Sequence, residues 1–212
     1  MDTIIQILAR ELGRSEAHVE NVVRLIDEGN TIPFIARYRK ELHGAMDDTA
    51  LRTLADRLQY LRNLDKRREE VKSAIEGQGK LTEELSAAID AAATLAEVED
   101  LYRPYRQKRR TRATVAREKG LEPLAELLFA QAADGPAPEE AAGAFVDPEK
   151  GVETAEDALQ GASDIIAERI SDDADIRKRL RELVWKKGYL VSAAAAKEPE
   201  DTVYRLYYAF RS

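Results

Sequence analysis

Apolar residues recur at the three- and four-residue spacing of an amphipathic helix along nearly the whole chain. At the amino terminus this spacing predicts one helix over residues 4–12 that ends at Gly13, and a second helix that Ser15 caps and Gly29 ends. Two short helices joined by a glycine are typical of a helical hairpin. They also fit part of a helix-turn-helix, and the pattern leaves both interpretations open.

The longest predicted helix begins at a cap among Asp47, Asp48 and Thr49 and runs to about residue 76, where Gly77 and Gly79 follow. Its apolar residues start as a heptad repeat and then move to another face of the helix: Leu51, Leu54, Leu58 and Leu61 are followed by Leu64, Val71 and Ile75. A stripe that changes face argues against a free coiled coil. It favours a helix that passes from one set of packing partners to another.

Glycine and proline divide the rest of the chain into shorter segments. In the first half of the chain we expect helices over 33–42, from Thr82 through the following alanines, and after Thr94 as far as Pro104. Two further helices are expected over 113–119 and 122–133. Of the last three, the first should start at a capping box formed by Thr154 and Asp157, the second should run from Ser171 to Lys187, and the third should run from Glu198 to the end, with a brief extended piece at 189–191. The chain is therefore predicted to be all-α, a multi-helix bundle with helical hairpins, one long helix and short connecting loops. It forms one helical region, 1–212, and a subdivision into 1–133 and 134–212 stays open because residues 134–138 have the composition of a linker.

Composition agrees with helices and narrows the class of protein. Aromatic residues make up only 6% of the chain, and the absence of cysteine excludes disulfides, thiolate metal sites and cysteine nucleophiles. The first residues lack the basic start and apolar run of a signal peptide, and no stretch approaches the ~20 apolar residues that span a bilayer. We expect a cytoplasmic protein with no membrane partner.

Charge is distributed unevenly along the chain, whose net charge is −7. Residues 134–175 are strongly acidic, whereas between residues 103 and 119 the only acid is Glu118. A local cluster of cations in an acidic chain suits nucleic acid or an acidic protein surface, and Tyr102 and Tyr105 among the cations can stack on bases or under guanidinium groups. The candidate nucleic-acid contacts in this basic stretch are Arg106, Lys108, Arg109, Arg110, Arg112 and Arg117. The alternative is a solvated loop whose cations pair with acidic helices of the same chain.

A second, weaker candidate is the predicted helix over residues 33–42. Phe34, Ile35 and Tyr38 are expected in the core, and Arg37, Arg39 and Lys40 are expected to face solvent or a phosphate-bearing ligand. A core helix with a solvated basic side explains the same pattern.

The sequence shows no arrangement of residues that predicts catalysis. His18 and His43 lack neighbours at metal-ligand spacing and are expected at the surface, and no phosphate loop, nucleophile elbow or zinc-protease motif is present. The adjacent acids Asp47–Asp48 and Asp172–Asp173 suit the starts of helices better than a catalytic pair. We expect no enzymatic activity, no cofactor, no metal and no small-molecule substrate.

Several segments resemble one family. RPYRQKRRTRATVAREKGLEPLA, which starts at Arg103, and NTIPFIARYRKE, which starts at Asn30, are similar to segments of the Tex family of bacterial transcription accessory proteins. ALQGASDIIAERI and the closing YRLYYAFRS are compatible with it but less specific. The resemblance covers essentially all of the chain and only the amino-terminal helical part of the family. It implies a fragment of a longer protein whose RNase H-like domain, helix-hairpin-helix segment and RNA-binding barrel lie outside this sequence.

Two functions remain in competition. The resemblance implies a helical scaffold of a protein that binds RNA or DNA without sequence preference, mainly through the missing downstream domains, and that acts with the transcription machinery. The alternative is a protein-interaction or intramolecular docking module with no nucleic-acid affinity of its own, which the acidic total charge favours.

Overall fold

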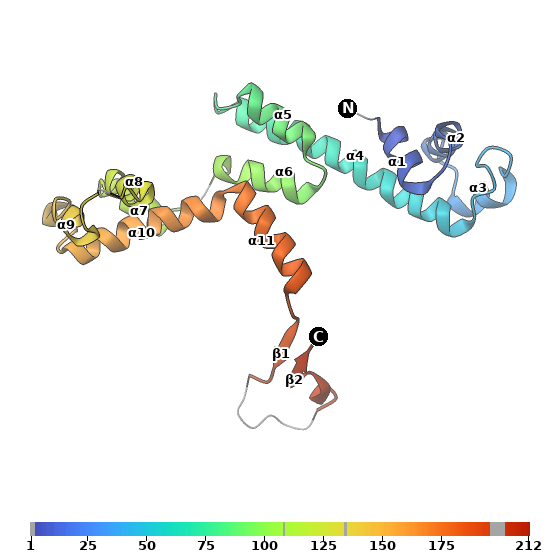
Figure 1. Ribbon diagram of the computed structural model, residues 1–212. Coiled ribbons are helices and arrows are strands. Elements are labelled where there is room, and N and C mark those ends of the chain that lie inside the picture. The colour runs from blue at the N-terminus through green and yellow to red at the C-terminus, as the bar shows by residue number, and fades with distance from the viewer. Residues whose placement is uncertain (1–2, 108, 134, 196–201) are drawn as a thin grey trace. The chain divides into compact units, whose positions relative to one another are not determined.

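The computed structural model describes residues 3–107, 109–133, 135–195 and 202–212. Over these residues it contains eleven α-helices, three short 3-10 helices and one two-stranded sheet, which confirms the all-α prediction (Figure 1). The chain forms two compact units, Met1–Val98 and Glu99–Ser212, and each has its own core. The subdivision between residues 133 and 134 stays a prediction. No helix in the described ranges is both long and apolar enough to cross a membrane.

The first unit is built from helices whose starts were visible in the sequence. The side chains of Ser15, Asp47 and Thr82 accept hydrogen bonds from backbone N–H groups three residues further on, so these predicted caps are confirmed. The helices are α1 (Ile4–Leu12), α2 (Glu16–Asp27), α3 (Ile32–Tyr38), α4 (Asp48–Glu76), α5 (Glu83–Ala91) and α6 (Leu95–Tyr102), the last of which begins here and ends in the second unit.

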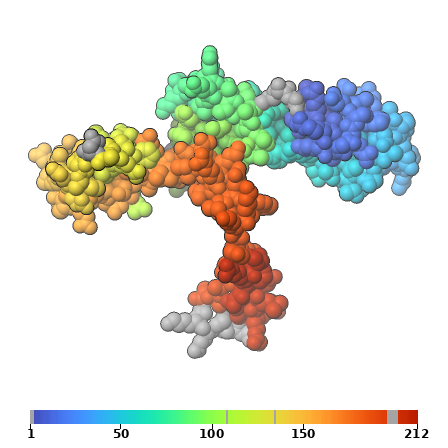
Figure 2. Space-filling model, viewed as in Figure 1, coloured from blue at the N-terminus to red at the C-terminus, as the bar shows by residue number. Residues whose placement is uncertain are grey.

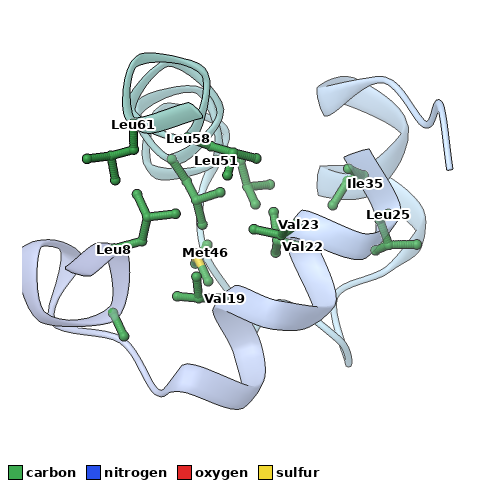
Figure 3. Close-up of a cluster of buried hydrophobic side chains, with 12 residues drawn as sticks. Leu8, Val19, Val22, Val23, Leu25, Ile35, Met46, Leu51, Leu58 and Leu61 are labelled. Carbon is green, nitrogen blue, oxygen red and sulfur yellow. The ribbon is translucent and has the colours of Figure 1, made fainter. Parts of the chain in front are cut away.

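The core of the first unit gathers α1, α2 and α3 around the first half of α4. Figure 3 shows Leu8, Val19 and Val22 pointing toward the α4 leucines, of which Leu51 and Leu58 are fully or almost fully buried. Beyond them α4 turns a different face inward, and Lys72 pairs with Asp90 of α5 at 2.9 Å. The predicted change of packing partner along the long helix is therefore confirmed.

Helix α3 is shorter and less buried than its sequence pattern predicted. It ends at Tyr38 instead of residue 42, and of the three residues expected in the core only Ile35 is buried. Phe34 and Tyr38, expected in the core, are 37% and 57% exposed. Residues four apart share one face of a helix, and α3 turns the opposite face toward α4.

The prediction of a surface position was also wrong for His43, which is only 1% exposed. The loop after α3 folds back onto α2, where Asn21 Nδ2 donates to the carbonyl oxygen of Leu42 at 3.3 Å. Gly44 makes this turn with a φ of 59°, and a Cβ there would collide with the ring of His18. The turn, which the sequence pattern does not specify, buries the imidazole.

The second unit centres on one helix, α10, which packs against α7, α8 and α9. Gly161 allows the closest of these contacts, because a Cβ there would overlap Leu121 Cδ1 and lie 3.3 Å from Ala116 Cβ. The elements are the 3-10 helix η1 (Arg103–Tyr105), α7 (Arg112–Glu118), α8 (Glu122–Ala130), α9 (Pro138–Gly143), η2 (Pro148–Lys150), α10 (Ala155–Asp172), α11 (Ala174–Lys187), β1 (Val191–Ala193), η3 (Arg205–Tyr207) and β2 (Ala209–Arg211).

Two boundaries in the second unit differ from the prediction. The capping box at Thr154 and Asp157 is confirmed, but α10 continues through Ser171, and Asp173 caps α11. The predicted terminal helix is wrong over residues 202–212, where η3 leads into β2, while its expected start at Glu198 lies outside the described residues. Strands β1 and β2 pair antiparallel, with Ser192 opposite Phe210. This pairing is not local in sequence and overrides the helical spacing of the last apolar residues.

Candidate nucleic-acid interface

The basic stretch follows η1 and leads into α7. Pro104 lies in η1, and Thr111 caps α7 by accepting a hydrogen bond from the backbone N–H of Thr114 at 3.1 Å. Arg106, Arg109 and Arg110 therefore lie on the connection between these two elements, with Arg112 at the first position of α7. Lys108 lies outside the described residues.

Most cations of this stretch have partners within the second unit. Each ion pair joins the stretch to α6, to the end of α7 or to α10: Arg103 with Asp172 (2.9 Å), Arg106 with Glu99 (2.6 Å), Arg110 with Glu118 (2.6 Å) and Arg117 with Glu168 (2.7 Å). Lys119 Nζ donates to the carbonyl oxygen of Gly151 at 2.7 Å. For these residues the structure follows the alternative in which the cations pair within the chain.

Arg117 is the most firmly held of the predicted contacts. Glu168, a part-buried carboxylate of α10, accepts hydrogen bonds from Arg117 Nη1 and from the hydroxyl of Thr111, which is also the cap of α7. The hydrogen bond to Glu168 holds the pKa of Arg117 above its usual value. These contacts attach both ends of α7 to α10, so Arg117 has a structural role and little freedom to reach a phosphate.

Arg109 and Arg112 differ from their neighbours. Both are exposed, and neither has an ion-pair partner among the residues that the structure describes. Arg110 lies between them, and its pair with Glu118 is exposed on both sides, so a phosphate can replace the carboxylate at little cost. A groove of about 410 Å³ is lined by Arg110, Arg112 and Lys119 and by Asp157 and Asp164 of α10.

The basic residues on α3 and just after it belong to an exposed group with two aromatic rings, here called the α3 patch: Phe34, Arg37, Tyr38, Arg39 and Lys40. The two ring centroids are 5.2 Å apart, and the Arg39 guanidinium carbon lies 5.6 Å from the centroid of Phe34. Arg37, Arg39 and Lys40 have no ion-pair partner in the described ranges. Unpaired cations beside exposed rings are the composition that single-stranded nucleic acid favours.

Sequence reasoning missed a third basic surface. In the described residues from α11 to the end of the chain, two acids, Asp175 and Glu182, stand against eight cations: Arg177, Lys178, Arg179, Arg181, Lys186, Lys187, Arg205 and Arg211. A count of charge over this segment would have found it. The basic stretch at 103–119 is the more prominent of the two in the sequence, because its cations are nearly contiguous.

The adjacent acids have ordinary structural roles. Asp47 caps α4 and Asp48 pairs with Arg52 in its first turn, as expected for a helix start. Asp173 caps α11, but Asp172 ends α10 and pairs with Arg103, so only half of the second pair fits that prediction. Among the described residues no group of three His, Cys, Asp or Glu side chains is arranged to hold a metal ion.

Comparison with known proteins identifies the class of this helical region. The profile described as Tex-like protein N-terminal domain matches residues 2–76, and the profile described as Tex central region-like matches residues 134–212. The first match lies within the first compact unit and the second match lies within the second.

Individual relatives agree with both profiles. The chain is 47% identical over 208 residues to the protein named tex of Bordetella pertussis and 41% identical over 206 residues to the transcriptional accessory protein Tex of Neisseria gonorrhoeae. It is 31% identical over 196 residues to the human S1 RNA-binding domain-containing protein 1. These matches cover 98%, 97% and 92% of the chain but only 26%, 27% and 19% of the relatives. The chain belongs to the Tex family.

Proposed function

We propose that this chain is a non-catalytic helical scaffold of a transcription accessory protein, and that it contacts the phosphates of nucleic acid through Arg109, Arg112 and the α3 patch. The observation that carries the proposal is the division of the cations. The arginines of the basic stretch that hold the fold together are paired with carboxylates. Arg109, Arg112 and the cations of the α3 patch are exposed and have no ion-pair partner among the described residues. The names of the gonococcal and human relatives, which refer to transcription and to RNA binding, support the same class of ligand.

Binding of this kind would be independent of sequence. Long exposed side chains reach phosphates, and specificity would need groups held against base edges. The chain's net charge of −7 repels a polyanion at a distance, so the affinity should be modest and should fall steeply with salt. A role in transcription would place the protein with the nucleic acid, in the cytoplasm of a bacterial cell.

The second candidate function is a docking module without nucleic-acid affinity. The four ion pairs of the basic stretch show that it already satisfies carboxylates, and an acidic partner could take the remaining arginines in the same way. The two functions differ in what the chain binds when no protein partner is present.

The double variant R109E/R112E should weaken binding to every single-stranded sequence alike. Each lost phosphate contact should shallow the slope of log affinity against log salt by roughly 0.7, so the change should be about 1.4 for the pair. Because neither arginine is paired with a described carboxylate, the melting temperature should stay within about 2 °C. Fluorescence anisotropy with a labelled oligonucleotide at several salt concentrations measures the slope, and a thermal melt measures the stability.

The matched control is R14E/K80E, which changes the net charge by the same amount at two exposed positions of the first unit. It should alter the affinity only slightly. Equal losses in both double variants would show that net charge alone controls binding. No wild-type binding at low salt would favour the docking module.

The purified chain should not hydrolyse nucleoside triphosphates and should not cut RNA or DNA, with or without divalent metal. Asp47 and Asp173 serve as helix caps, and Asp172 and Glu168 are held in ion pairs. We therefore expect none of these carboxylates to act in catalysis. Phosphate release and gel assays measure the activity. Turnover that survives repurification and disappears when one carboxylate is replaced would contradict it.

A further inference from the structure

Helix α11 and the hairpin formed by β1 and β2 make a surface that differs from the rest of the chain, here called the basic arm. The whole chain is acidic, yet the described residues of the basic arm carry a large excess of cations. Every residue from Lys178 to Lys187 is exposed, over more than two turns of α11. In Figure 1 and in Figure 2 this helix is the orange segment that leads into the red hairpin.

The cations of the basic arm fall into two groups. Arg177 and Arg181 donate hydrogen bonds to Asp100 and hold the start of α11 in place. Arg179, Lys186 and Lys187 are exposed and have no ion-pair partner among the described residues. Arg179 and Lys186 are seven residues apart, so both project from the same side of the helix, two turns from each other.

Two exposed aromatic rings are close to these cations in the sequence. Trp185, the single tryptophan of the chain, is 91% exposed. Tyr189 follows four residues later and is also exposed, and the guanidinium carbon of Arg211 lies 4.0 Å from the centroid of its ring. An indole left in water costs free energy unless an apolar or aromatic surface covers it.

We propose that the basic arm binds single-stranded nucleic acid, with bases stacked on Trp185 and Tyr189 and phosphates held by Arg179, Lys186 and Lys187. The charge selects a polyanion, and the exposed rings select one with flat, unpaired faces, because bases inside a duplex are already stacked. This surface lies on different elements from the basic stretch, and its binding does not require Arg109 or Arg112.

Trp185 makes the test direct, because at excitation wavelengths that tyrosine does not absorb all of the fluorescence comes from this one indole. Titration of the intact chain with an unlabelled single-stranded oligonucleotide should quench that fluorescence as a base stacks on the ring. Inorganic polyphosphate supplies the charge without the bases and should cause little quenching. A duplex of the same length should quench far less than the single strand.

Variants of Trp185 test the contribution of the ring separately from that of the charges. W185A should weaken binding of a labelled oligonucleotide at least about fivefold, the lower end for one lost base stack, while W185F should keep most of the affinity. Both variants should fold, since Trp185 contacts mainly solvent. R109E/R112E, which removes the contacts proposed for the basic stretch, should still show quenching.

Three outcomes would overturn the proposal. The first is no quenching by the oligonucleotide at low salt, and the second is equal quenching by polyphosphate. The third is self-association that W185A abolishes while no oligonucleotide binds, which would identify a second copy of the chain as the occupant. If quenching persists in R109E/R112E while the salt slope is unchanged, the basic arm binds and the basic stretch does not, so the two proposals fail separately.

Discussion

The double variant R177M/R181M should lose about 2–4 kcal/mol of stability, because it leaves a buried carboxylate without its counter-charges. Asp100 is only 4% exposed and accepts hydrogen bonds from Arg177 Nε at 2.6 Å and from Arg181 Nη2. A fully buried pair that loses one side costs roughly 3–5 kcal/mol, and we lower the range because both arginines are partly hydrated. Urea denaturation followed by circular dichroism at 222 nm measures the loss.

Asp100 is buried whereas its two arginine partners are partly exposed, and this difference leads to a second expectation. D100N should cost less than R177M/R181M, since the arginines can return to water whereas the carboxylate cannot. Adding D100N to R177M/R181M should therefore recover part of the lost stability. The matched control is R179M, an exposed position on the same helix that should change stability by less than about 0.5 kcal/mol.

The same cluster should make stability depend on pH. Burial acts to raise the pKa of Asp100, but the hydrogen bonds and charges of Arg177 and Arg181 outweigh it, so the pKa lies below its usual value. A carboxyl group with a lowered pKa in the folded state adds stability above the unfolded value of about 3.9, and that stability is lost as the pH falls further. The gap between wild type and R177M/R181M should be largest near neutrality, should begin to narrow as the unpaired carboxyl of the variant is protonated, and should narrow further below about pH 4. A gap that is constant with pH would show that the arginines act through packing alone.

Replacing Gly161 with leucine should destabilise the second unit by about 3 kcal/mol, through overpacking. Even a single Cβ at this position of α10 would overlap Leu121 Cδ1, and Leu121 is itself only 1% exposed and has no room to move away. G161A should fall between leucine and wild type, because about 1 kcal/mol of gained helix propensity offsets part of the overlap. Thermal and urea denaturation give the order of the three proteins.

Gly143 is the matched control for this series. It also lies in a helix of the second unit, at the end of α9, and a Cβ there would meet no atom within 4 Å. G143A and G143L should therefore be neutral or slightly stabilising. Equal losses at both glycines would mean that the contact between α10 and Leu121 is not close, contrary to the geometry described above.

The sequence predicted the features of this fold that depend on nearby residues. A cap such as Asp47 acts on an N–H three residues away, and the leucines from Leu51 to Leu61 show their common face through their own spacing. Both kinds of signal lie within a few turns of helix. The long helix, most helix starts and the class of the fold were therefore accessible without coordinates.

Features that join distant parts of the chain were not accessible. The partner of Asp100 lies 77 residues away in Arg177, and the partner of Arg117 lies 51 residues away in Glu168. The pairing of β1 with β2 is of the same kind, and it replaced the predicted terminal helix. In the candidate interface the residue types were visible in the sequence, but the division between paired and exposed arginines was not, because it depends on which acidic helix lies beside each one.

Each of the two cores is made from one continuous part of the chain, which bears on how the protein folds as it is synthesised. The first core uses residues from Leu8 to Leu61, and the second uses residues from Ala113 to Ile165. Contacts within such short stretches lower the entropic cost of closing the loops between the contacting residues, and this favours rapid folding. The first unit can therefore reach its native packing while the ribosome is still adding the second. A fault in α10 would then leave the folding of α1 to α4 unaffected.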